Sequence, residues 1–301
     1  MKPGWRWLAI VAVLCLALLA TVLVLPFHPA GLKWLVQQAQ DLSGGRLQVT
    51  GLSGDIRGPL KLETLTLALP DKRIRLQGLS LDWQPAELWH RSLHVTRVHL
   101  ARLEIDLLKP RNKPPEAPQS LALPVSLRVD EARLDTLVLS RPGGTQTYTD
   151  GRAKLADDGR YLLELQHLQS PWGTLAGRLR LEKRSPFALA GQLSGTRSVP
   201  VPLALQAEVA GSLLEPVIKA LAAGDGLKLK AYLTLAPFTA LPVKHLVIAA
   251  EGLDPRTLFA SAPQASLNLS GQFSSSAQGG LLGQLAVDND IPGSLDQGRL
   301  P

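Results

Sequence analysis

From residue 46 onward, hydrophobic and polar residues alternate with a period of two. Leu65, Leu67 and Leu69 form one such run, and Leu137 and Leu139 belong to another. Strict alternation is the pattern of β-strands that have one apolar and one polar face. Clusters of Gly, Pro and Asp separate the runs, so we expect about eighteen to twenty connected strands.

So many strands present a long apolar face, and the sequence predicts few helices to cover it. An open sheet of this size must curl, close or split. We therefore predict a mainly β fold, in which a long curled antiparallel-type sheet forms an elongated hydrophobic groove (a β-taco). A closed barrel or sandwich is the alternative, and burial of the apolar face distinguishes the two. The predicted groove-lining residues are Leu65, Leu67, Leu69, Leu79, Leu81, Leu103, Ile105, Leu107, Leu123, Val125, Leu127, Leu137 and Leu139.

Residues 7–25 contain no charged residue and lie between Arg6 and Pro26. A helix of this length spans about 29 Å, roughly the thickness of a bilayer core. Lys2 and Arg6 predict that residues 1–6 stay in the cytoplasm and that the rest of the chain is exported. We expect an uncleaved, single-pass signal anchor in the inner membrane of a Gram-negative bacterium, with the bulk of the chain in the periplasm.

Two other readings of this segment fit less well. A cleaved signal peptide needs a small-x-small site, and Leu18-Leu19-Ala20 is a poor one. A lipoprotein needs a small residue before Cys15, where Leu14 stands instead. We interpret Cys15 as an apolar residue of the anchor helix.

The exported part divides by composition. Residues 26–44 predict a short amphipathic helix that Gly44 and Gly45 end, and residues 45–108 predict a first β module. Residues 109–119 hold four prolines and predict a linker or insertion, before a repeating β-groove over 120–301. Within these modules we expect one helical turn at 85–89, which begins at a proline, and a second short helix at 214–223.

The net charge of +7 is confined to the N-terminal third. Residues 1–30 carry +2, residues 31–113 carry 13 − 8 = +5, and residues 114–301 carry 17 charges of each sign. No basic stripe interleaved with aromatic residues is present, so we expect no nucleic-acid partner. Excess positive charge next to an anchor is typical of contact with anionic lipid head groups.

The sequence offers little for catalysis or metal binding. One cysteine excludes a disulfide framework and a cysteine-based metal site. His94 and His99 are five residues apart in a predicted strand, which places them on opposite faces, without the partners that a metal site needs. Nucleophile-elbow and zinc-protease motifs are absent from the sequence. We expect no enzymatic activity, no cofactor and no metal.

Two blocks carry a family resemblance. GLSGDIRGPLKL runs over residues 51–62, and LSLDWQP runs over residues 79–85. Placed behind the anchor and the short helix, they resemble the N-terminal module of the TamB family, which belongs with the AsmA-like proteins. The resemblance is specific over residues 1–108 and rests on composition and periodicity beyond them. The matching motif positions are Gly51, Gly54, Gly58, Trp83 and Pro85.

The resemblance implies a repeating β-groove related to bridge-like lipid transfer proteins. It also implies an inner-membrane subunit of the translocation and assembly module, which carries phospholipid acyl chains towards the outer membrane. The implied protein partner is the outer-membrane barrel TamA, through a C-terminal region that this chain lacks. Family members are several times longer, so we expect 120–301 to be a truncated array without a cap. The alternative role is a scaffold or chaperone for outer-membrane β-barrel assembly or autotransporter secretion.

Overall fold

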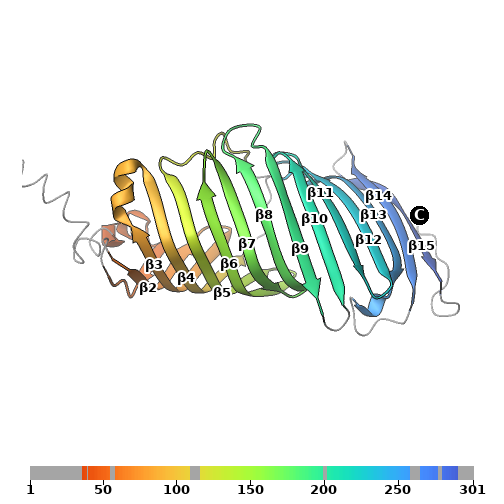
Figure 1. Cartoon of the computed structure of the whole chain (residues 1–301), viewed down its shortest axis with the longest axis horizontal. Helices are drawn as coiled ribbons and strands as arrows, with labels where there is room; N and C mark the ends of the chain where they lie inside the picture. Colours follow the sequence, from red (N-terminus) through yellow and green to blue (C-terminus); the bar gives the residue numbers. More distant parts are fainter. Residues whose placement is uncertain are drawn as a thin grey trace, which may run out of the picture. The chain divides into compact units, whose positions relative to one another are not determined.

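The computed structural model describes residues 36–38, 40–54, 58–108, 116–198, 202–257, 265–276 and 280–290. These residues form fifteen strands in one sheet, and the order of strands in the sheet is their order in the sequence (Figure 1). Two short 3-10 helices, η2 and η3, accompany the strands. The prediction of a mainly β fold with one large sheet and few helices is confirmed.

The strands are mostly nine residues or longer. Their bounds are β1 Leu47–Thr50, β2 Leu60–Ala68, β3 Lys72–Gln84, β4 Ser92–Leu107, β5 Ser126–Arg141, β6 Gly144–Asp157, β7 Arg160–Ser170, β8 Gly173–Glu182, β9 Leu189–Arg197, β10 Leu203–Gly211, β11 Pro216–Gly224, β12 Leu227–Leu235, β13 Val243–Leu253, β14 Leu267–Ser275 and β15 Leu281–Asn289. The helices are η2 Pro85–His90 and η3 Pro255–Thr257.

The chain divides into two compact units. The first unit comprises Met1–Lys109 and Val129–Gln146, and the second comprises Pro110–Arg128 and Thr147–Pro301. In the first unit β1, β2, β3 and β4 pair antiparallel in turn. In the second unit each strand from β7 to β15 pairs antiparallel with the next.

β4 and β5 run in the same direction, unlike these hairpins. His94 contacts Asp130, and five residues further along both strands His99 contacts Asp135. In an antiparallel pair the partner's number would fall as the first number rises. Parallel neighbours need a connection of a dozen or more residues, and the chain from 108 to 125 supplies it. We call described residues 116–125 of this connection the crossover segment.

A β-bulge at Thr96 changes the side on which the β4 residues lie. Asp82 pairs with Arg97, whereas the next residue, Trp83, pairs with Val95, so Thr96 is the extra residue. Its hydroxyl donates to the Asp82 carbonyl at 3.0 Å. The extra residue shifts the alternation by one.

Consequently, His94 and His99 lie on the same face of the sheet. The prediction that they lie on opposite faces was wrong, because spacing in an unbroken strand does not include a bulge.

Two further expectations need correction. Residues 214–223 are not a helix: β11 runs through Pro216–Gly224, where β-branched Val217 and Ile218 pair with both neighbouring strands. The described residues hold fifteen strands, fewer than expected, because runs counted separately merge. For example, the runs at Ile74 and Leu79 both belong to β3.

The single turn expected at 85–89 is confirmed as η2, with Pro85 at its start. Before β1 the chain is helical at 36–38 and 40–42, and Gly44 and Gly45 follow with φ of 62° and 79°. The anchor predicted at 7–25 lies outside the described residues. Within the residues described, none of the helices reaches the length and apolar character that crossing a bilayer requires.

Candidate functional site

One face of the second unit is apolar from strand to strand. The pairing aligns apolar residues in rows that cross the strands. One row contains Leu163, Leu179, Gly191, Val209 and Ile218. The next row contains Leu165, Gly177, Leu193, Ala207 and Ala220. Charged and polar residues occupy the alternate positions, as in the row of Glu164, Arg178, Gln192 and Glu208.

This face is hollowed over β7 to β11. The hollow has a volume of about 360 Å³ and is lined chiefly by Leu163, Leu165, Leu179, Leu193, Val209 and Ile218. Ligand pockets in proteins have volumes of this order and are mostly apolar. The hollow therefore has the size and surface to accept part of a hydrocarbon chain.

Glycines on this face let leucines lie across the backbone. A Cβ at Gly191 would lie 2.8 Å from Leu179 Cδ1 and 3.1 Å from Val209 Cγ1. A Cβ at Gly195 would likewise lie 2.9 Å from Leu175 Cδ2. Large side chains thus pack over small neighbours, so the apolar surface is even and continuous from strand to strand.

The apolar face has no second layer above it in the described part of the chain. That part consists of one sheet, two 3-10 helices and the short helical stretch before β1, so no further sheet or long helix packs on it. Among the described residues only Phe187 is a large side chain that is wholly buried, at 1% exposure. A closed barrel or sandwich of this size would bury many leucines completely. Most apolar strand residues here are half-buried instead.

Residues predicted to line a groove in the first unit lie in comparable rows. Leu65 and Leu103 flank Leu76, and Leu67 and Ile105 flank Ile74. Leu79 and Leu81 lie in two other rows, opposite Leu100 and Val98. The partner residues Ile74, Leu76, Val98 and Leu100 extend the predicted set.

Between the rows around Leu76 and the rows around Leu79, successive apolar residues are three positions apart instead of two. This holds in each of β2, β3 and β4. The regular pairing skips the row of Glu63, Gly78 and Ala101, and Gly78 has a left-handed φ of 64°. Residues three positions apart in a regular strand lie on opposite faces. They can lie on one face where each strand carries one extra residue, and the residues of this skipped row are those extra residues.

The remaining predicted residues are scattered. Leu107 ends β4, while Leu127, Leu137 and Leu139 lie in β5. Leu69 follows β2 in a turn, where its amide donates to the Lys72 carbonyl.

Leu123 and Val125 precede β5, and Leu123 is 49% exposed. The structure therefore brings the β2–β4 residues together, while Leu69, Leu123 and Val125 lie outside the strands.

The crossover segment lies against one end of the apolar face in the second unit. The Leu121 amide donates to the Lys183 carbonyl at 3.0 Å, and the Tyr161 hydroxyl donates to the Leu121 carbonyl at 2.6 Å. Beneath it, Lys183 forms an ion pair with Asp157 and lies 5.1 Å from the Tyr161 ring centre. The Asp157 carboxylate also accepts from the Leu127 amide at 3.2 Å. The crossover segment thus covers the ends of β7 and β8, and Leu127 at the start of β5 contacts the end of β6.

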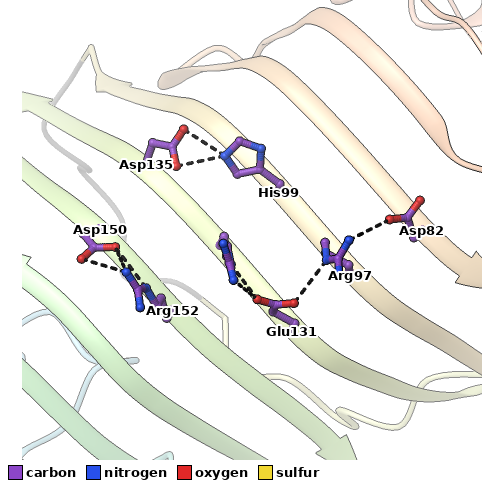
Figure 2. A network of polar contacts seen from close by, with 8 residues as sticks. Asp82, Arg97, His99, Glu131, Asp135, Asp150 and Arg152 are labelled. Atoms are coloured by element: carbon purple, nitrogen blue, oxygen red, sulfur yellow. Dashed lines mark hydrogen bonds and ion pairs between the residues drawn. The ribbon is translucent and has the colours of Figure 1, made fainter.

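The opposite, polar face of the first unit carries a network of ion pairs. Figure 2 shows Arg97 between Asp82 and Glu131, with His99 beside Asp135. Hydrogen bonds from Arg97 and then Arg133 lower the pKa of the Glu131 carboxyl.

A second cluster lies on β3 and β4. The hydrogen bond from Arg102, supported by Arg75, lowers the pKa of Glu104. These groups stabilise the sheet on the side away from the apolar rows.

The motif positions have structural roles around β1–β4. Gly51 and Gly54 have φ of 67° and 95°, and a Cβ at Gly54 would lie 2.1 Å from the Pro59 carbonyl oxygen. Trp83 lies opposite Val95 beside the bulge, and Pro85 begins η2. Gly58 precedes β2.

One known protein family matches half of the chain. The family model described as "TamB, N-terminal domain" matches residues 18–168, half of the chain. The chain belongs to the TamB family. The match ends within β7, so it includes the described residues of the first unit and the crossover segment. No curated protein and no solved structure matches the chain. Membership of the TamB family connects the protein with outer-membrane biogenesis and the translocation and assembly module.

Residues of the hollow in this TamB-family chain were not among the predicted lining residues. Leu163, Leu165, Leu193 and Val209 are examples. Their strands alternate, but small residues such as Gly191 and Ala207 occupy some apolar positions, so a search for repeated leucines passes over them. Counting Gly and Ala as apolar in an alternating run would have found β9 and β10.

Proposed function

We propose that this protein holds phospholipid acyl chains on the apolar face of its sheet and carries them between the inner and outer membranes. The observation that supports this most is the apolar face, which is hollowed over β7–β11 and has no covering layer among the described residues. The proposed role is non-enzymatic. Contact between such a face and water is unfavourable in free energy, and contact with a hydrocarbon chain is favourable.

The energetics suit transport. Burial of a methylene contributes about 0.8 kcal/mol, so a chain of sixteen carbons gains on the order of 13 kcal/mol gross. A single closed pocket with that affinity would release its ligand slowly. Neighbouring strands here lie about 4.8 Å apart and repeat similar apolar rows, so a chain can move one strand along while its contacts change little.

The proposed cellular setting follows from the family and the sequence. Residues 7–25 anchor the protein in the inner membrane, and the sheet extends in the periplasm. The proposed outer-membrane partner is the barrel protein TamA.

A scaffold for outer-membrane strands is the second candidate, and one feature favours it. In the described residues β15 has a neighbour on one side only, and Leu282 on it is 64% exposed. An unpaired edge can accept a further strand by β-augmentation. In that case the backbone of β15 would bind the client, and the apolar face would carry no lipid.

Lipid extraction from the purified full chain tests the proposal. The protein is expressed in a Gram-negative host, purified in mild detergent, and its bound phospholipid is measured by mass spectrometry. Leu193→Asp places a carboxylate in the hollow, whereas Ser194→Asp places one on the adjacent polar position of β9. We expect Leu193→Asp to lower bound phospholipid several-fold and Ser194→Asp to leave it unchanged. Equal lipid content in both variants would contradict the proposal.

A further inference from the structure

A second cavity lies at the rim of the apolar face, beside the crossover segment. Its volume is about 640 Å³, and its lining includes Ala122, Glu182, Lys183, Arg184 and Pro186. Leu181 and Leu189 form the last apolar pair of β8 and β9 before this cavity. The apolar face therefore leads directly to it.

The loop between β8 and β9 is held firmly around the cavity. Phe187 is wholly buried and has a φ of 57°. Its amide donates to the Arg184 carbonyl at 2.7 Å, and its carbonyl accepts from the Leu213 amide at 2.9 Å. The loop thus presents its polar side chains from a fixed backbone.

Two cations line the cavity, and they differ in their partners. Lys183 is neutralised by Asp157 and is covered by the crossover segment. Arg184 is exposed, and within the described residues no carboxylate forms an ion pair with it. Glu182, the carboxylate in the lining, lies 3.7 Å from Arg160 instead. Arg184 is therefore available to an anionic group in the cavity.

We propose that this cavity binds the phosphate group of a phospholipid whose acyl chains lie on the apolar face, with Arg184 as the principal donor. The proposal rests on the lipid-carrying function above. Glu182, which ends β8 and lines the cavity, lies three residues beyond Leu179, which is about 10 Å along the strand. That separation corresponds to the reach from the upper acyl chain to the phosphate. Ala122 of the crossover segment lines the cavity, so this segment forms one of its walls.

The test uses the purified full chain and two photoreactive phospholipids. One carries a diazirine in the acyl chain and the other carries it in the head group, and adducts are mapped by mass spectrometry. We expect acyl-chain adducts at the hollow of β7–β11 and head-group adducts within residues 182–188. Arg184→Glu should lower the head-group adducts about fivefold and leave the acyl-chain adducts in place, which also shows that the variant folds. Arg180→Glu, on the polar face of the adjoining strand β8, is the matched control and should change neither.

The outcomes separate the two proposals. Acyl-chain adducts on the face together with head-group adducts that do not respond to Arg184→Glu would overturn the phosphate site alone. Absence of acyl-chain adducts from the wild-type hollow would overturn both. Inorganic phosphate is tested on the delipidated chain by hydrogen exchange. Protection of 182–188 by millimolar phosphate alone, with head-group adducts unaffected by Arg184→Glu, would identify a free-phosphate site and contradict the lipid assignment.

Discussion

Asp157 and Lys183 form an ion pair on the apolar face of the second unit, where the Asp157 side chain is 1% exposed. A charged pair this deeply buried is costly unless its other hydrogen-bonding capacity is used. Here the Leu127 amide donates a hydrogen bond to Asp157, and the Lys183 ammonium lies over the Tyr161 ring. The pair therefore also fixes the chain as it enters β5. The crossover that makes β4 and β5 parallel neighbours is thereby tied to β6–β8.

Removing one member of this pair should destabilise the protein. Asp157→Ala leaves Lys183 without its partner, and we expect the free energy of unfolding to fall by about 2–4 kcal/mol. Chemical denaturation measures the loss. Asp158→Ala, at the exposed neighbouring position, should change stability by less than about 0.5 kcal/mol. A similar loss in both variants would show that the ion pair contributes nothing specific.

The close packing over Gly191 makes a second prediction. Gly191→Val would drive side-chain carbons into Leu179, Val209 and the Arg178 carbonyl, and we expect a loss of about 1–3 kcal/mol. Because the new side chain would also displace Leu179 and Val209, which line the hollow, bound phospholipid should fall as well. Gly143→Ala is the control, since nothing lies within 4 Å of the added carbon. An unchanged stability for Gly191→Val would mean that the leucines do not pack across this backbone.

Stability should depend on pH through Glu104 and Glu131. Arginine hydrogen bonds hold both pKa values below the ordinary 4.5, so the unfolded state binds protons first as pH falls. The stabilisation is complete above pH 4.5 and is lost as pH falls through 4.5 towards the folded pKa values. Denaturation midpoints between pH 6 and pH 3 check this.

The matched variants make that pH prediction specific. Glu131→Gln should flatten the decline in stability, while Glu251→Gln, without an ion pair in the described part of the chain, should not. Parallel pH curves for the wild type and Glu131→Gln would contradict the assignment.

Alternation predicted the strands and their apolar sides well. Leu227, Leu229 and Leu233 lie on one side of β12, with Lys228 and Lys230 between them, as a period of two requires. η2 was equally predictable, because Pro85 favours the first position of a helical turn. These features depend only on residues near in sequence.

Features that depend on distant residues could not be predicted. Leu121 and Leu123 alternate like a strand, yet the crossover segment is held by Lys183 and Tyr161, some forty to sixty positions away. The bulge at Thr96 likewise depends on how β3 pairs with β4. Local spacing cannot reveal either, because the partner strand decides where an extra residue is accommodated.

The central claim is that the apolar face is open and carries lipid. Site-specific photocrosslinking in cells tests it most directly, with the probe placed at Leu179 or Leu229 and at the adjacent polar positions Arg180 or Lys230. Adducts are identified by mass spectrometry. We predict phospholipid adducts at Leu179 and Leu229 and none at Arg180 and Lys230. Protein adducts alone, or no adducts at the two leucines, would show a covered face and contradict the account.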